Sequence, residues 1–182
     1  MNIVSRRGLG LALGSLLLAS CNQAPPPPPP AAVPSTIYLV RHAEKAGEEG
    51  DVPLTEAGAA RARELARVLG EAGVRQIYTT QYQRNVDTAK PLAEKLSIAP
   101  MVIPADNVEE LVERLKATPP GEAALVVSHT DKLPMIGEKL GVPFPAVAHT
   151  EYDRLTVVTL VTTAGQANAD ARILRFGQQV AP

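Results

Sequence analysis

Hydrophobic and polar positions follow two periods along most of the chain. Short apolar or β-branched runs predict buried strands, and longer stretches with apolar residues every three or four positions predict helices. Strands are expected at residues 36–40, 76–79, 101–103, 124–127, 155–161 and 171–176, and helices at 56–69, 85–96, 108–117 and 132–140. Strands that alternate with helices indicate an α/β fold, a three-layer α/β/α sandwich around a mostly parallel sheet.

Single residues refine these elements. Thr55 is expected to cap the first helix, which should end near Gly70 or Gly73. Pro91 should either kink the second helix or split it. The fourth strand is entirely apolar, which predicts a central place in the sheet.

The N-terminal residues have the pattern of an export signal. Arg6 and Arg7 precede an apolar run at residues 9–18, and Leu-Ala-Ser leads directly into Cys21. This arrangement resembles a bacterial lipobox, so we expect residues 1–20 to be a signal peptide and Cys21 to be lipidated. A retained N-terminal anchor or a buried helix is the alternative, and the choice between Sec and twin-arginine export stays open.

A proline-rich segment follows the signal. Residues 22–34 contain seven prolines, six of them consecutive at 25–30. Such a sequence favours polyproline II and cannot build a core. We therefore expect residues 21–34 to be the lipidated cysteine and a tether, with a ligand for a polyproline-binding domain as the alternative, and residues 35–182 to form the folded domain.

Charge and cysteine content agree with an exported protein. Removal of residues 1–20 takes away two arginines and no acids, which leaves 16 Lys and Arg against 19 Asp and Glu. This mildly acidic balance, with only 3% aromatic residues, disfavours a nucleic-acid partner. Cys21 is the only cysteine, so no intramolecular disulfide forms. The expected location is extracytoplasmic, anchored by lipid on the periplasmic side of a bacterial membrane.

The candidate functional residues lie just after the ends of predicted strands. Arg41 and His42 directly follow the first strand, His129 follows the fourth strand, and Arg84 comes shortly after the second. In α/β sheets ligands bind beyond the carboxyl ends of the strands. Forked guanidinium donors match phosphate oxygens, so these four side chains predict a phosphate site.

Four segments carry a family resemblance. They are TIYLVRHAE at 36–44, PLTEAG at 53–58, YTTQYQRNVDTA at 78–89 and LVVSHT at 125–130. In this order and spacing they resemble the motifs of the histidine phosphatase superfamily, whose fold is phosphoglycerate mutase-like, over residues 36–162. Ala43 and Ser128 stand where the family commonly has glycine, and both are small enough to preserve the site.

The resemblance implies covalent phosphoryl transfer. Neutral His42 would attack phosphorus, and water would hydrolyse the resulting phosphohistidine. Arg41, Arg84 and His129 would bind the phosphoryl group and balance its charge. No metal or other cofactor is expected, and a metal site built from His42, His129 and His149 is disfavoured because the nearby acids lack ligand spacing.

Several residues are candidates for the proton donor to the leaving group. Asp106 is favoured because many relatives carry an acid roughly 25 residues after the second arginine. Glu109, Glu110 and Asp131 are the alternatives, and Asp106 could instead cap the following helix.

Two further positions have minor expected roles. Glu44 and Lys45 are interpreted as a surface ion pair rather than as residues of the pocket mouth. His149 is expected at the rim or on the surface.

These observations predict an exported lipoprotein that hydrolyses small phosphomonoesters of the cell envelope. No long insertion lies between Val86 and Val126 to form a lid, which favours the compact phosphatase branch over the sugar-phosphate mutases. The alternative is a catalytically inactive lipoprotein of the same fold that binds a phosphorylated ligand.

Overall fold

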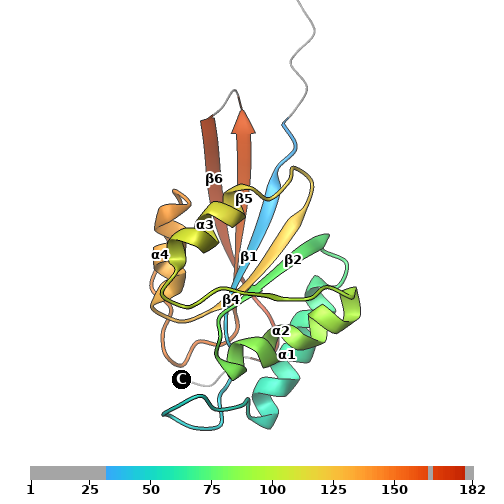
Figure 1. Cartoon of the computed structure of the whole chain (residues 1–182), viewed down its shortest axis with the longest axis vertical. Coiled ribbons are helices and arrows are strands. Elements are labelled where there is room, and N and C mark those ends of the chain that lie inside the picture. Colours follow the sequence, from blue (N-terminus) through green and yellow to red (C-terminus); the bar gives the residue numbers. More distant parts are fainter. Residues whose placement is uncertain (1–31, 164–165, 179–182) are drawn as a thin grey trace, which may run out of the picture. The chain divides into compact units, whose positions relative to one another are not determined.

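One six-stranded sheet organises the computed structural model, which describes residues 32–163 and 166–178. The strand order is β3-β2-β4-β1-β5-β6 (Figure 1). The strands are β1 (Ser35–Arg41), β2 (Val74–Thr79), β3 (Met101–Val102), β4 (Ala123–Ser128), β5 (Arg154–Thr163) and β6 (Gln166–Arg175). Strands β1 to β4 run parallel to one another, whereas β5 pairs antiparallel with both β1 and β6. The sheet is therefore mixed, and the predicted α/β fold is confirmed.

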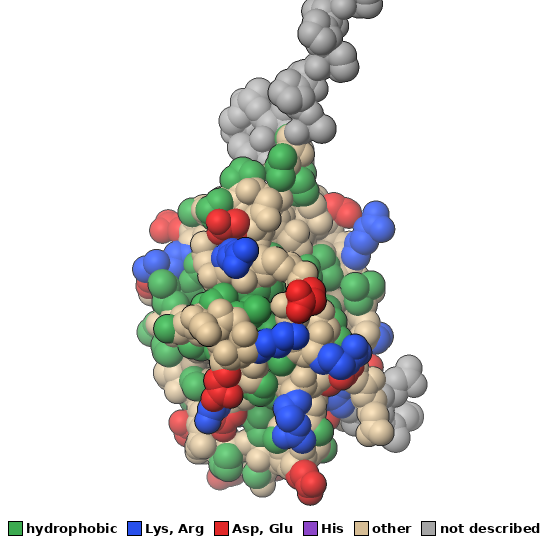
Figure 2. All heavy atoms as spheres, turned by 90° about the vertical axis from the view of Figure 1, so that its right-hand side faces the viewer, with side chains coloured by type: hydrophobic (Ala, Val, Ile, Leu, Met, Phe, Trp, Pro, Cys, Tyr) green, Lys and Arg blue, Asp and Glu red, His purple; other side chains and the backbone are tan. Residues whose placement is uncertain are grey.

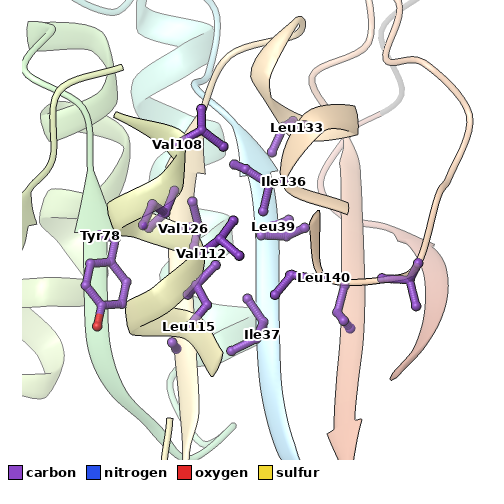
Figure 3. Close-up of a cluster of buried hydrophobic side chains, with 14 of the residues drawn as sticks. Ile37, Leu39, Tyr78, Val108, Val112, Leu115, Val126, Leu133, Ile136 and Leu140 are labelled. Atoms are coloured by element: carbon purple, nitrogen blue, oxygen red, sulfur yellow. The ribbon is translucent and has the colours of Figure 1, made fainter. Parts of the chain in front are cut away.

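Helices cover both faces of the sheet (Figure 1). They are α1 (Glu56–Leu69), α2 (Gln83–Leu96), α3 (Val108–Lys116) and α4 (Lys132–Lys139). Apolar side chains of α1 and α2 form one buried cluster with the sheet, and those of α3 and α4 form another. Figure 3 shows the second cluster, in which Val112, Leu115 and Ile136 pack over Ile37, Leu39 and Val126. The two layers of helix hold the sheet, and with it the strand ends, in place.

The start of α1 lies against the chain that follows β1. The hydroxyl of Thr55 accepts a hydrogen bond from the Gly58 amide at 3.0 Å, as the predicted N-cap should. A β-carbon at Gly58 would lie 2.3 Å from the carbonyl oxygen of Glu44, so only glycine permits this approach. Gly70 is the C-cap, and Gly73 adopts a left-handed φ of 72° just beyond it.

Two predictions about the helices are decided. Of the two alternatives for Pro91, the split is excluded, because Pro91 lies inside one continuous α2. The side chain of Asn107, and not that of Asp106, caps α3 by accepting from the Glu110 amide. A helix start needs its acceptor immediately before the first turn, and Asn107 is one residue closer to it.

The register between β1 and β4 aligns the two predicted histidines. Arg41 pairs with Ser128 at the last rung of this parallel ladder, so His42 and His129 both follow the same rung. Every residue of β4 is buried, in agreement with its predicted central position. Neighbouring strands lie about 4.8 Å apart, so the two imidazoles must emerge side by side.

The expected signal peptide and Cys21 lie outside the described residues. Among residues 32–163 and 166–178, no helix combines the length and the apolar character needed to span a membrane. On the face that α1 and α2 cover, basic and acidic side chains are interspersed (Figure 2).

Candidate active site

An open pocket of about 600 Å³ lies at the carboxyl ends of β1 and β4. It brings together all four residues predicted to bind phosphate. Its lining consists of Arg41, His42, Lys45, Glu48, Arg84, His129, Thr130, Asp131, His149, Thr150 and Tyr152. Residues separated by more than 100 positions in sequence thus share one space.

His42 is held in a single tautomer. Its Nδ1 atom lies 2.8 Å from the carbonyl oxygen of Ala43. A carbonyl oxygen can only accept, so Nδ1 carries the proton and donates it. The Nε2 atom therefore keeps its lone pair, as a nucleophile requires.

His42 and His129 are neutral at physiological pH. Burial lowers the pKa of His42 to about 3, against the raising effect of the Ala43 hydrogen bond, and the cationic neighbours Arg41 and Arg84 lower it further. Burial also lowers the pKa of His129 to about 4, with a further contribution from Arg84. An uncharged imidazole at position 42 is the form that can attack phosphorus.

His129 packs closely against the first histidine. The two ring centroids lie 5.6 Å apart. The Nε2 atom of His129 lies 3.0 Å from the hydroxyl of Thr80, and the ring meets that of Tyr82 edge-on at 5.2 Å. These contacts fix the orientation of the second imidazole.

Arg41 is clamped by the loop before β5. Its Nη1 atom donates to the carbonyl oxygens of Ala148 and His149, and Nη2 donates to the Tyr152 hydroxyl at 3.3 Å. The guanidinium also lies over the Tyr152 ring, 4.1 Å from its centroid. The buried Nε atom of Arg41 has no hydrogen-bond partner among the described residues.

Arg84 has a parallel arrangement on the other side of the pocket. It sits in the first turn of α2, and its guanidinium lies 4.4 Å from the ring centroid of Tyr82. Its buried Nε atom is also without a partner in the described part of the chain. A buried N–H group without an acceptor is costly, and both of these groups belong to arginines that line the pocket.

Thr88 supports the residue after the nucleophile. Its hydroxyl accepts from the Ala43 amide at 2.9 Å and donates to the Arg84 carbonyl at 2.6 Å. One side chain thus connects the backbone beside His42 to the helix turn that carries Arg84.

The predicted pair of Glu44 and Lys45 is wrong. Glu44 instead binds Arg61 of α1 through contacts of 3.0, 3.0 and 2.7 Å. Lys45 lines the pocket and donates to the carbonyls of Gly47 and Glu48. Neighbouring residues of an extended segment point in opposite directions, which sends Glu44 to the helix and Lys45 to the mouth.

The candidate acids differ sharply in position. Asp106, the favoured proton donor, is not among the lining residues, and its carboxylate binds Lys132 at 3.0 Å. Glu109 pairs with Lys139, and Glu110 with Arg114, away from the lining. Asp131 alone of the four lines the pocket.

His149 lies at the rim of the pocket, as expected from the sequence. Its side chain is exposed, and its backbone carbonyl binds Arg41. Among the residues that the structure describes, no group of three or more His, Cys, Asp or Glu side chains could hold a metal ion.

Sequence reasoning did not find Tyr82, Tyr152 or Thr80. Tyr82 lies two residues before Arg84, a spacing that could have drawn attention to it. Tyr152 carries no such signal, because only the folded loop brings it over Arg41.

The sequence comparison with protein families agrees with this site. Residues 37–106 match the model of the histidine phosphatase superfamily (branch 1). The matched segment contains Arg41, His42 and Arg84 and ends before His129. No curated protein matches the chain.

Solved structures share the fold at low sequence identity. Mycobacterial hydrolase 2 is 17% identical, with a TM-score of 0.68, over 82% of this chain and 94% of that one. The mycobacterial glucosyl-3-phosphoglycerate phosphatase is 17% identical with a TM-score of 0.59, over 70% and 91%. The protein histidine phosphatase SixA, complexed with tungstate, is 17% identical with a TM-score of 0.55, over 77% and 96%. The predicted phosphoglycerate mutase-like fold is confirmed.

Proposed function

We propose that this protein hydrolyses phosphomonoesters through a phosphohistidine formed on Nε2 of His42. The observation that carries the proposal is the hydrogen bond between His42 Nδ1 and the Ala43 carbonyl. It leaves a free lone pair in a pocket with two arginines whose Nε atoms have no partner among the described residues. A nucleophile and donors for an oxyanion are the parts that phosphoryl transfer requires.

The reaction has two steps at one centre. Nε2 of His42 attacks phosphorus, the bond to the leaving oxygen breaks, and that oxygen takes up a proton. Water then attacks the phosphohistidine, which releases inorganic phosphate and restores His42. Arg41, Arg84 and His129 bind the three remaining oxygens in both steps.

Asp131 is the best placed of the predicted acids to serve the leaving group. Asp106 would have to leave its ion pair with Lys132 and move into the pocket. Asp131 already lines the pocket, two residues beyond His129.

Hydrolysis, rather than transfer back to a substrate, suits the open shape of the site. The described segment between α2 and β4 contains only β3, α3 and short connections, and residues 106, 109 and 110 of this segment do not line the pocket. Water can therefore reach the intermediate. The named phosphatases with this fold act on a glucosyl-phosphoglycerate or on protein phosphohistidine, which supports a phosphorylated substrate here.

We also propose export as a lipoprotein, with Cys21 as the lipidated residue and substrates from the cell envelope. The support is the pattern of residues 1–21 and the proline-rich segment after it. Labelling of cells with a fatty-acid analogue, followed by isolation of the wild-type chain and of Cys21→Ser, tests this part separately. Incorporation that persists in Cys21→Ser contradicts it.

Rapid labelling with an alkaline quench tests the enzyme proposal. The wild type, mixed with a ³²P-labelled phosphomonoester, should trap an acid-labile and base-stable phosphoryl group, and His42→Gln should trap none. His149→Gln, which changes a rim histidine of the same pocket, should keep the label. A label that stays in His42→Gln places the intermediate elsewhere and contradicts the mechanism.

Measurements of phosphate binding and of hydrolysis distinguish the phosphatase from the alternative, a catalytically inactive lipoprotein that binds a phosphorylated ligand. A wild type that binds inorganic phosphate, measured by calorimetry, but hydrolyses none of a panel of phosphomonoesters is the inactive lipoprotein. A wild type that hydrolyses members of the panel and traps the label is the phosphatase.

A further inference from the structure

The two edges of the sheet differ greatly in length. At one edge β3 contains two residues, whereas at the other edge β6 contains ten. β6 pairs with β5 along its whole length, from Arg175 opposite Arg154 to Gln166 opposite Thr163. The backbone groups on its outer side have no strand partner in the described part of the chain.

β6 lacks several of the features that usually protect an edge, although it carries Asp170, Arg172 and Arg175. Its sequence, QANADARILR, contains neither proline nor lysine, and its pairing with β5 shows no bulge. Ile173 and Leu174 are 39% and 52% exposed near its end. A long, regular and partly apolar edge is a template for another strand.

We propose that β6 pairs antiparallel with β6 of a second copy of this chain, about a two-fold axis at Ala171. A two-fold axis that continues the sheet keeps each side chain on its own face. Residues directly opposite each other must then both have odd numbers or both have even numbers. The two-fold axis therefore lies at a residue that faces its own copy in the partner subunit.

Charge selects Ala171 among these registers. An axis at Asp170 would place two aspartates opposite each other, and an axis at Arg172 would place two arginines opposite each other. An axis at Ala171 instead places Asp170 opposite Arg172 of the partner subunit, twice per dimer. Within the chain the two side chains already lie 3.6 Å apart, but they are 72% and 82% exposed, so the contact with the partner subunit replaces only a weak surface ion pair. Opposite charges directly across a ladder stabilise it, and like charges destabilise it.

The same register covers the exposed apolar residues. Ile173 comes opposite Ala169 of the partner subunit, on the face where Ala169 and Ala171 pack against the core. Leu174 comes opposite Asn168 of the partner subunit. The register therefore satisfies the charges and shields both large apolar side chains.

Charge variants of the full chain, studied by sedimentation velocity in non-ionic detergent, test this register. Asp170→Arg gives four arginines and no acid at the paired positions, and Arg172→Asp gives four acids. Each single variant should weaken dimerisation roughly tenfold or more. The double variant Asp170→Arg/Arg172→Asp should restore it.

Mixing the two single variants is the most specific test of the register. In a mixed dimer each arginine faces an aspartate, so equimolar Asp170→Arg and Arg172→Asp should form a heterodimer more tightly than either variant associates with itself. Neither residue lines the pocket, so hydrolysis of a phosphomonoester by each variant reports that it is folded. A monomeric wild type, or a dimer that the charge changes leave intact, overturns the proposal.

Discussion

The hydroxyl of Thr88 accepts a hydrogen bond from the backbone amide of Ala43 at 2.9 Å, and so holds the residue whose carbonyl fixes the tautomer of His42. Both residues are buried, so no solvent can replace this contact without a rearrangement. A side chain outside the pocket lining thus controls which nitrogen of the nucleophile is free.

Replacement of Thr88 by valine should therefore impair both folding and catalysis. Valine has nearly the same shape but leaves the Ala43 amide without an acceptor, which costs about 1–3 kcal/mol. Urea unfolding and steady-state hydrolysis measure the two effects. Thr88→Ser, which keeps the hydroxyl, is the matched control and should retain most of both. A loss in Thr88→Ser that exceeds the loss in Thr88→Val would show that the methyl group, and not the hydrogen bond, is important.

The stability of the protein should fall as the pH is lowered from about 6.5 towards 4. Burial lowers the pKa of His42 to about 3 and of His129 to about 4, whereas an imidazole in the unfolded chain titrates at about 6.5. Within this window the unfolded state binds more protons, so acid favours unfolding, and the effect levels off below the folded pKa values. Each unit of pKa difference corresponds to about 1.4 kcal/mol.

Urea unfolding at pH 7 and pH 4 measures this dependence. Carboxylates also titrate in this range, so the double variant His42→Gln/His129→Gln serves as the reference. It should lose less stability than the wild type between the two pH values. An identical loss in both proteins would assign the dependence to other groups.

The ion pair between Arg61 and Glu44 should be important for stability. Arg61 is 8% exposed and also donates to the carbonyls of Phe176 and Gln178. Arg61→Leu leaves the half-buried Glu44 carboxylate without its partner, which should cost about 1–3 kcal/mol. Glu44→Gln/Arg61→Leu removes the unpaired charge and should recover part of this loss. Chemical unfolding of both variants checks the order, and a double variant less stable than Arg61→Leu would contradict it.

Arg84→Lys should reduce kcat/KM by about 10²-fold. Lysine keeps the charge but loses the forked donors, the Nε–H group and the planar contact with Tyr82. Tyr82→Phe keeps the ring beneath Arg84 and should lower kcat/KM only a few-fold. Steady-state kinetics with one phosphomonoester compares them. A lysine variant as active as Tyr82→Phe would show that charge alone suffices at this position.

Most of the fold was predictable because local patterns and the global fold agree. Apolar runs placed five of the six strands within two residues of their observed starts, and α1 has the predicted bounds. The exception is β6, which begins at Gln166 rather than Ala171, because its first half is polar and is held by the ladder to β5. Pairing between strands decides such a segment, and single-residue patterns do not record it.

The site was predictable where backbone topology determines it. Arg41, His42 and His129 lie at adjacent strand ends, so their convergence followed from a parallel sheet alone. The proton donor was not predictable in this way. Which acid approaches the pocket depends on the paths of the loops and on ion pairs, such as the contact between Asp106 and Lys132. The partners of Glu44 and Arg41 come from residues 17 and more than 100 positions away, beyond the range of local sequence reasoning.

The last rung between β1 and β4, where Arg41 pairs with Ser128, sets the gap between the two imidazoles by main-chain geometry. That gap does not depend on which apolar side chains fill the layers above and below. Extensive exchange of core residues can therefore accumulate without changing the spacing of the reacting groups. To alter the substrate preference of this pocket, the pairing of β1 with β4 should be left unchanged. The loop of residues 146–152, which forms one wall of the pocket, is the part to vary.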